Sequence, residues 1–262
     1  MATPALARSC PVRRGARGAA MLLACAFAAN AQVVTAPVGL TASVPAFSAM
    51  APGAATTGWR FAGLPSQKIA PTRFDVVDLG GKRVLRVQAD ASYGALLWDA
   101  GSARLGQGAL LRWSWQLERG LAQSDLSRKE GDDSPLKLCA SFDMPLDGLP
   151  FAERTKLRMA RALSGQALPS ATLCYVWDRL LPEGSLIHNP HSSRVRFIVV
   201  NSGTARPGQW LAHERNLTQD FARTFGQESP VLPPLSALLI GADADNTQGS
   251  SLGYVGDVIL AP

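Results

Sequence analysis

The sequence lacks several of the short motifs by which enzymes are commonly recognised. Its 262 residues contain no H-E-x-x-H, no phosphate-binding G-x-x-x-x-G-K-[ST] and no C-x-x-C. Histidine occurs three times and cysteine four times. These absences exclude the motif-defined zinc proteases, P-loop nucleotide hydrolases and thioredoxin-like oxidoreductases. Any catalysis would have to use a less recognisable set of side chains.

Long hydrophobic runs are also missing. No segment approaches 18 uninterrupted apolar residues, so the sequence predicts no membrane-spanning helix. Charged residues make up 18% of the chain and hydrophobic residues 47%, proportions typical of a folded globular protein.

Acidic residues are absent from the first 31 positions, which contain four arginines. A short apolar run over residues 19–28 follows the arginines, and Ala29-Asn-Ala31 provides a small-x-small cleavage site. These are the three parts of a secretory signal peptide. We therefore predict that residues 1–31 direct export, to the periplasm or the medium, and are removed. The alternative is a lipoprotein, because Leu22-Leu-Ala-Cys25 resembles a lipobox that would tether the chain to a membrane through Cys25.

The net charge of +6 belongs mostly to this N-terminal segment. Without its four arginines, 22 basic residues remain against 20 acidic ones, a net charge of +2. A nearly neutral mature chain does not favour nucleic acid as a partner.

Two cysteines remain after the predicted cleavage, Cys139 and Cys174, each within an apolar run. An even pair in an oxidising compartment favours a disulfide between two strands. Such a bond would close a loop of about 35 residues and stabilise the fold by about 3–4 kcal/mol. The alternative is two buried free thiols that act as small hydrophobic side chains.

The chain after residue 31 divides into two parts by composition. Residues 32–57 contain no charged side chain and are rich in Ala, Thr, Pro, Ser and Val, which predicts an extended lead-in or tether. The folded domain is predicted over residues 58–262. There, short strand-forming runs alternate with turn-forming Gly, Pro, Asp and Ser clusters. The clearest run is Leu111–Leu117, where apolar and polar side chains alternate as in a strand with one buried face.

The predicted fold is all-β. About ten short strands are expected, the last over Tyr254–Leu260, and helices only at Phe151–Leu163 and Thr218–Phe225. This pattern indicates a two-sheet β-sandwich, jelly-roll-like, with one or two short inserted helices. The four basic residues of the first helix are expected on a solvated face, with a membrane- or polyanion-binding face as the alternative.

A set of acidic and other polar residues supplies a candidate site. The set comprises Asp132, Asp133, Asp178, Glu214, Arg215, Asp243, Asp245 and Asn246. Such oxygens suit calcium, although an EF-hand loop from Asp243 would need a glutamate where Tyr254 stands, so we predict no cofactor and keep calcium as the alternative. Carboxylates from separate loops would instead act as general acid and base on a sugar. The remaining interpretation is polar turns that bond their own backbone.

Histidine and tryptophan give weaker indications. His188 and His191 would bind zinc only with a third ligand, and a pair of exposed loop histidines is the more common case. The six tryptophans would stack on sugar rings if they were exposed, but those in alternating strands are expected in the core.

An ordered set of motifs resembles a known bacterial family. The motifs are Asp132-Asp133, Tyr175-Val-Trp177, Val199-Val-Asn-Ser-Gly203, the run from Trp210 to Gly226, and the ending Ala242–Thr247 with Gly253–Asp257. Over about residues 45–262 they are similar to the Domain of Unknown Function 3047 family. The resemblance implies an exported protein and supplies no activity. Lys137 stands where the resemblance leads us to expect arginine, and Cys139 where an aromatic residue is usual, so the chemistry of a site there would differ.

Together these features favour a non-catalytic exported protein of the cell envelope that binds a glycan or another polar ligand on a face or rim of the sandwich. One alternative is a hydrolase or lyase acting on polysaccharide, which requires the carboxylates to converge in one cleft with shifted pKa values. The other is a structural partner in an envelope assembly, which would expose a large apolar patch.

Overall fold

The computed structural model describes residues 43–54, 57–64, 67–164 and 168–261. The predicted signal peptide and Cys25 lie outside these residues. All of the described residues belong to one unit, Pro37–Pro262. Within them, no helix is long and apolar enough to cross a membrane.

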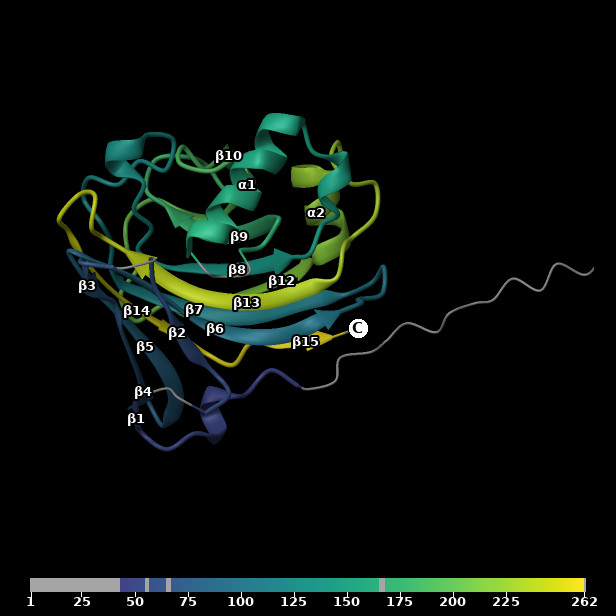
Figure 1. The fold of residues 1–262 in the computed structure, drawn as a ribbon. Coiled ribbons are helices and arrows are strands. Elements are labelled where there is room, and N and C mark those ends of the chain that lie inside the picture. Colours follow the sequence, from purple (N-terminus) through teal and green to yellow (C-terminus); the bar gives the residue numbers. More distant parts are fainter. Residues whose placement is uncertain (1–42, 55–56, 65–66, 165–167, 262) are drawn as a thin grey trace, which may run out of the picture. The chain divides into compact units, whose positions relative to one another are not determined.

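Two β-sheets form this unit (Figure 1). The seven-stranded sheet has the order β1-β4-β5-β14-β7-β12, and β15 also pairs with β7. Its strands are β1 (Gly53–Ala54), β4 (Arg73–Leu79), β5 (Lys82–Asp90), β7 (Leu110–Arg119), β12 (Leu211–Asn216), β14 (Ser250–Val255) and β15 (Ile259–Ala261).

The eight-stranded sheet has the order β10-β11-β9-β8-β13-β6-β2, and β3 also pairs with β6. Its strands are β2 (Arg60–Ala62), β3 (Ala70–Pro71), β6 (Ser92–Ala103), β8 (Lys137–Phe142), β9 (Ala171–Asp178), β10 (Leu186–His188), β11 (Val195–Ser202) and β13 (Leu235–Asp243). Among the described strands, all pairs are antiparallel except β9 with β11 and β3 with β6.

Local sequence accounts for several of these elements. β4 and β5 form a hairpin whose two-residue turn, Gly80-Gly81, has positive φ at both positions, a conformation that glycine adopts without steric cost. In β7 the predicted alternation is confirmed, because Leu111, Trp113 and Trp115 are at most 3% exposed and lie between the sheets.

Two α-helices interrupt the strands, α1 (Phe151–Ser164) and α2 (Leu217–Phe225). Asn216 caps α2, since its Oδ1 accepts a hydrogen bond of 3.0 Å from the Gln219 amide. Short 3-10 turns lie at Phe47–Ala49 (η1), Lys129–Gly131 (η2) and Leu146–Gly148 (η3). The predicted all-β sandwich with two short helices is therefore confirmed.

Two boundaries differ from the prediction. Phe47 is fully buried and stacks on Trp59 at 5.3 Å between ring centroids, so packed structure begins before residue 58. The uncharged composition of this segment was consistent with a tether, but its apolar residues also suit a core. The predicted strand Tyr254–Leu260 is two strands, β14 and β15, because the backbone leaves the sheet at Gly256-Asp257-Val258.

Candidate functional site

The outer face of the eight-stranded sheet, opposite the main core, carries a cavity of about 830 Å³, which we call the cleft. Strand register places one row of side chains across five strands at its floor. The row consists of Phe197 on β11, Cys174 on β9, Cys139 on β8, Leu239 on β13 and Leu97 on β6. The middle of the cleft is therefore apolar.

The predicted disulfide lies in this floor. Cys139 and Cys174 stand directly opposite each other on β8 and β9 and are bonded. They pack with Leu126, Ile187 and Phe197 in a small second core outside the sandwich. The bond fixes the register of two central strands under the cleft, and it agrees with an oxidising compartment.

A largely buried ion pair lies at the polar end of the cleft. Lys137 on β8 donates from Nζ to Asp243 Oδ2 at 2.5 Å, and the Ser134 amide donates to Asp243 Oδ1 at 2.7 Å. Lys137 reaches across β13 at Gly241, where a Cβ atom would stand 3.3 Å from the lysine Cε and 3.0 Å from a backbone oxygen. The Asp243 carboxylate raises the pKa of Lys137, against the effect of burial. The lysine therefore stays charged inside the protein.

Asp132 lies in the same cleft with an unusual pKa. Burial, and next the nearby Asp243 carboxylate, raise this pKa to about 6. Asn189 Nδ2 donates to Asp132 Oδ2 at 2.6 Å, and His191 Nε2 lies 3.8 Å from the same oxygen. Asp132 thus changes its protonation near neutral pH, as a general acid or a pH-sensitive binding group does.

Three further polar side chains line the cleft. The pKa of Tyr93 is raised, mainly by burial, and the Lys137 ammonium lies 5.6 Å from its ring centroid. Asp245 Oδ1 is buried and has no hydrogen-bond partner among the described residues, and burial raises the pKa of this carboxyl, with Asp133 and Asp243 adding to the effect. Asn246 is exposed at the rim. A buried acceptor without a donor is a group that a ligand hydroxyl would satisfy.

Asp133 has a structural position behind the cleft. Its fully buried carboxylate accepts hydrogen bonds from the Asn246 amide at 3.1 Å, and from the Thr247 amide and hydroxyl at 2.7 and 2.6 Å. These bonds join the loop before β8 to the loop after β13. Because both oxygens are occupied, Asp133 is not available to bind calcium or substrate.

Asp178, Glu214 and Arg215 lie away from the cleft. Asp178 Oδ1 accepts from the amides of residues 180 and 181 at 2.7 and 2.5 Å, which makes it a turn residue after β9. Glu214 is exposed and pairs with Arg112, while Arg215 forms two bonds with Asp220. The structure thus brings together Asp132, Asp243, Asp245 and Asn246, with Asp133 behind them, and separates the other three.

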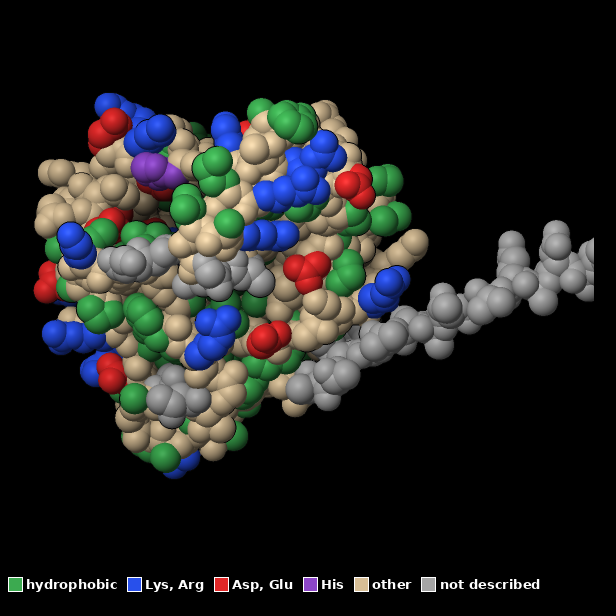
Figure 2. All heavy atoms as spheres, in the orientation of Figure 1, with side chains coloured by type: hydrophobic (Ala, Val, Ile, Leu, Met, Phe, Trp, Pro, Cys, Tyr) green, Lys and Arg blue, Asp and Glu red, His purple; other side chains and the backbone are tan. Residues whose placement is uncertain are grey.

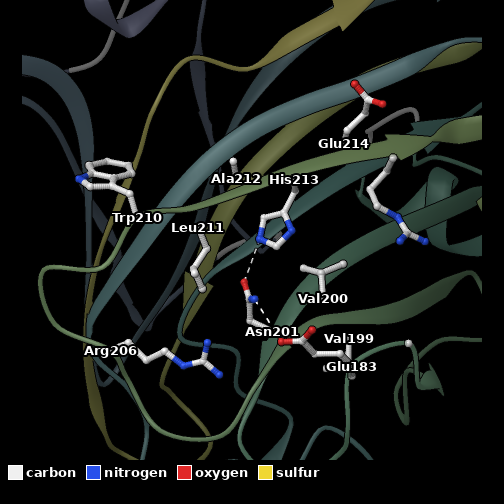
Figure 3. A pocket seen from close by; sticks show the side chains of 12 residues that line it. Glu183, Val199, Val200, Asn201, Arg206, Trp210, Leu211, Ala212, His213 and Glu214 are labelled. Atoms are coloured by element: carbon white, nitrogen blue, oxygen red, sulfur yellow. Dashed lines mark hydrogen bonds between the residues drawn. The ribbon is translucent and has the colours of Figure 1, made fainter.

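Glu214 and Arg215 line a second cavity of about 560 Å³ between β11 and β12, the edge pocket (Figure 3). Asn201 Oδ1 accepts from Trp115 Nε1 at 2.6 Å and pairs with His213 Nε2 at 2.9 Å, which places the histidine proton on Nε2. Burial lowers the pKa of His213 to about 4, so the ring is neutral at pH 7. Trp210, at the mouth, is 37% exposed, whereas the other five tryptophans are buried as expected.

Other sequence features give no site. The described residues hold no group of three or more His, Cys, Asp or Glu side chains arranged to bind a metal ion. Residues 249–253 match the G-x-S-x-G pattern of serine hydrolases. Ser251 is nevertheless fully buried in β14 and donates to the Pro135 carbonyl, so it is a strand residue without access to substrate.

Sequence reasoning missed Tyr93 and Asn189 as cleft residues and noted Lys137 only as a departure from a family pattern. Tyr93 and Leu97 are an even number of positions apart, so a strand would place both on the same face of the sheet. That Lys137 lies next to Tyr93 could not be inferred from the sequence. Lys137 and Asp243 are 106 positions apart, and only the pairing of β8 with β13 brings them together.

A family model described as "Protein of unknown function (DUF3047)" matches residues 57–259, which confirms the resemblance. No curated protein matches the chain. Two solved structures with similar arrangements are the family 11 carbohydrate-binding module of a Clostridium thermocellum cellulosomal cellulase and a family 12 xyloglucanase from Bacillus licheniformis. The module is 7% identical, with 84% of this chain and 94% of that chain covered and a TM-score of 0.39. The xyloglucanase is 8% identical, with coverage of 84% and 98% and a TM-score of 0.40. Similarity at this level transfers no activity to the chain.

Proposed function

The chain belongs to the DUF3047 family of proteins of unknown function. We propose that it is an exported protein that binds a hydroxyl-rich ligand of the glycan class in the cleft. Export is supported by the predicted signal peptide and by the Cys139–Cys174 disulfide.

The observation that carries this proposal is the convergence of donors and acceptors over an apolar floor. A sugar hydroxyl both donates and accepts, so it needs partners of both kinds. Asp132 and Asp245 Oδ1 accept, while Tyr93 carries a hydroxyl donor and Lys137 has N–H groups beyond the one that it gives to Asp243. The carbon face of a sugar ring would rest on the apolar row. Pockets of this composition, largely apolar with a few placed polar groups, are typical ligand sites.

Calorimetric titration with a panel of neutral, uronic-acid and amino-sugar oligosaccharides tests the proposal. Tyr93→Phe and His191→Ala each remove one polar group at the cleft. Each should weaken binding about 2- to 10-fold, the usual effect of one lost hydrogen bond. Trp210→Phe, in the edge pocket, is the matched control and should leave binding unchanged. Absence of binding to every oligosaccharide, or loss only with the Trp210 variant, would contradict the proposal.

A polysaccharide hydrolase or lyase is the second candidate, because Asp132 has a pKa near 6 beside a second carboxylate, Asp243. Two carboxyl groups with different environments are the usual acid and base of glycoside cleavage. Incubation with the same oligosaccharides distinguishes the candidates. New reducing ends or unsaturated products that disappear in Asp132→Asn would favour the enzyme, whereas binding without turnover favours the binding protein.

A further inference from the structure

Helix α1 exposes an apolar stripe. Phe151, Met159 and Leu163 are 75%, 59% and 83% exposed, and their spacing of eight and four residues places them along one side of the helix with Thr155 between them. Single exposed apolar residues are ordinary, but three large ones in one line on one helix mark an interaction surface. The helix itself buries only Leu157.

Two exposed basic side chains, Lys156 and Arg158, flank the stripe at helical spacing. With Arg154 and Arg161, which lie further round the helix, and against a single acid, Glu153, they give α1 a net charge of +3. Lys156 pairs with Glu153 at 3.4 Å, but Arg158 has no ion-pair partner within the described ranges. In the upper part of Figure 2 green apolar side chains lie next to blue basic ones over this region.

The helix is held to the sandwich by its opposite side. Leu157 is 7% exposed, Glu153 accepts from the Ser193 hydroxyl, and Arg161 Nε donates to the Leu168 carbonyl at 2.8 Å. Between α1 and the loop that carries Asn189 and His191 lies a hollow that borders the cleft. The apolar stripe is therefore presented outward beside the rim of the cleft.

We propose that α1 is a docking helix for an anionic lipid bilayer. The stripe enters the boundary between headgroups and acyl chains, and the flanking cations meet lipid phosphates, the arrangement of interfacial amphipathic helices. The positive charge selects an anionic surface over a neutral one. This inference goes beyond the proposed function and does not depend on what the cleft binds.

Vesicle co-sedimentation of the chain, as produced from its full coding sequence, tests the proposal. The vesicles contain phosphatidylcholine alone or phosphatidylcholine with phosphatidylglycerol. Wild-type protein should sediment with the anionic vesicles and much less with the neutral ones. Met159→Ser/Leu163→Ser and Lys156→Gln/Arg158→Gln should each bind roughly tenfold more weakly, since each pair removes apolar area or charge from the contact.

A matched control replaces two equally exposed apolar residues elsewhere, Val231→Ser/Ile259→Ser, and should bind like wild type. Every variant keeps the same N-terminal segment, so differences between them report on α1. Circular dichroism checks that each is folded. The proposal is overturned if wild-type protein does not sediment with anionic vesicles, or if the α1 variants bind them as well as wild type does. In the first case the exposed stripe would be assigned to an interface with another protein.

Discussion

At the residue scale, Asp132 is a carboxyl group of the cleft whose surroundings disfavour its charged form. Its pKa rises from 3.8 to about 6 because burial and then the Asp243 carboxylate disfavour its charge. The folded protein therefore holds this proton more tightly than the unfolded chain does. That contribution to stability is fully present below about pH 4 and is lost as the pH rises through 6.

Replacement of Asp132 by asparagine should consequently stabilise the protein at neutral pH. Asp132→Asn removes the charge and keeps an oxygen for Asn189 Nδ2, so we expect the free energy of unfolding at pH 7 to rise by about 1–3 kcal/mol. Near pH 4 wild type and variant should be nearly equal. Urea unfolding at the two pH values measures both differences, with the exposed Asp78→Asn as control. Equal stability at both would mean that Asp132 titrates as an ordinary carboxyl.

At the element scale, the disulfide joins β8 and β9 at the centre of the eight-stranded sheet. Cys139→Ala/Cys174→Ala should lower the free energy of unfolding by about 2–4 kcal/mol, since a cross-link of 35 residues restricts the unfolded chain. Denaturant unfolding measures the loss, and wild-type protein unfolded with reductant should match the variant. If wild-type protein gave the same denaturant unfolding curve with and without reductant, the disulfide would not stabilise the fold. Peptide mapping under non-reducing conditions checks the linkage itself.

Elements set by neighbouring residues could be predicted from the sequence, and contacts between distant ones could not. Alternation in β7, the Gly80-Gly81 turn and the Asn216 cap each depend on a few adjacent positions. The cleft instead depends on which strands pair, since β13 lies between β6 and β8. Asp178 was included in the candidate site as one of a set of oxygen-bearing residues, with a polar turn as the alternative, and the structure shows the turn.

At the scale of the whole molecule, residues 43–54, which precede the predicted start of the domain, pack against the sandwich. Phe47 is fully buried, and Trp59 Nε1 donates to the Pro45 carbonyl at 3.2 Å. Phe47→Ala should therefore destabilise the protein by about 3–4 kcal/mol, as expected when a buried aromatic ring is removed. Thermal or urea unfolding measures the change. Val231→Ala, at an exposed position, should alter stability by no more than about 0.5 kcal/mol. If Phe47→Ala had a similarly small effect, the segment around Phe47 would contribute little to stability, as predicted for a lead-in or tether.

The connection from β8 to β9 has a consequence for how such a protein changes over time. The two strands are neighbours, and their pairing reaches Phe142 opposite Ala171, so the chain that carries α1 leaves the sheet and returns at adjacent points. Within α1 itself only Leu157 is buried, whereas Met144 and Leu149, before the helix, belong to the main core. We therefore expect substitutions on the exposed side of α1 to change the stability of the fold little. On our proposals, substitutions on the outward side of α1 would change membrane docking, while the floor of the cleft, which is formed by the strands of the eight-stranded sheet, would stay as it is.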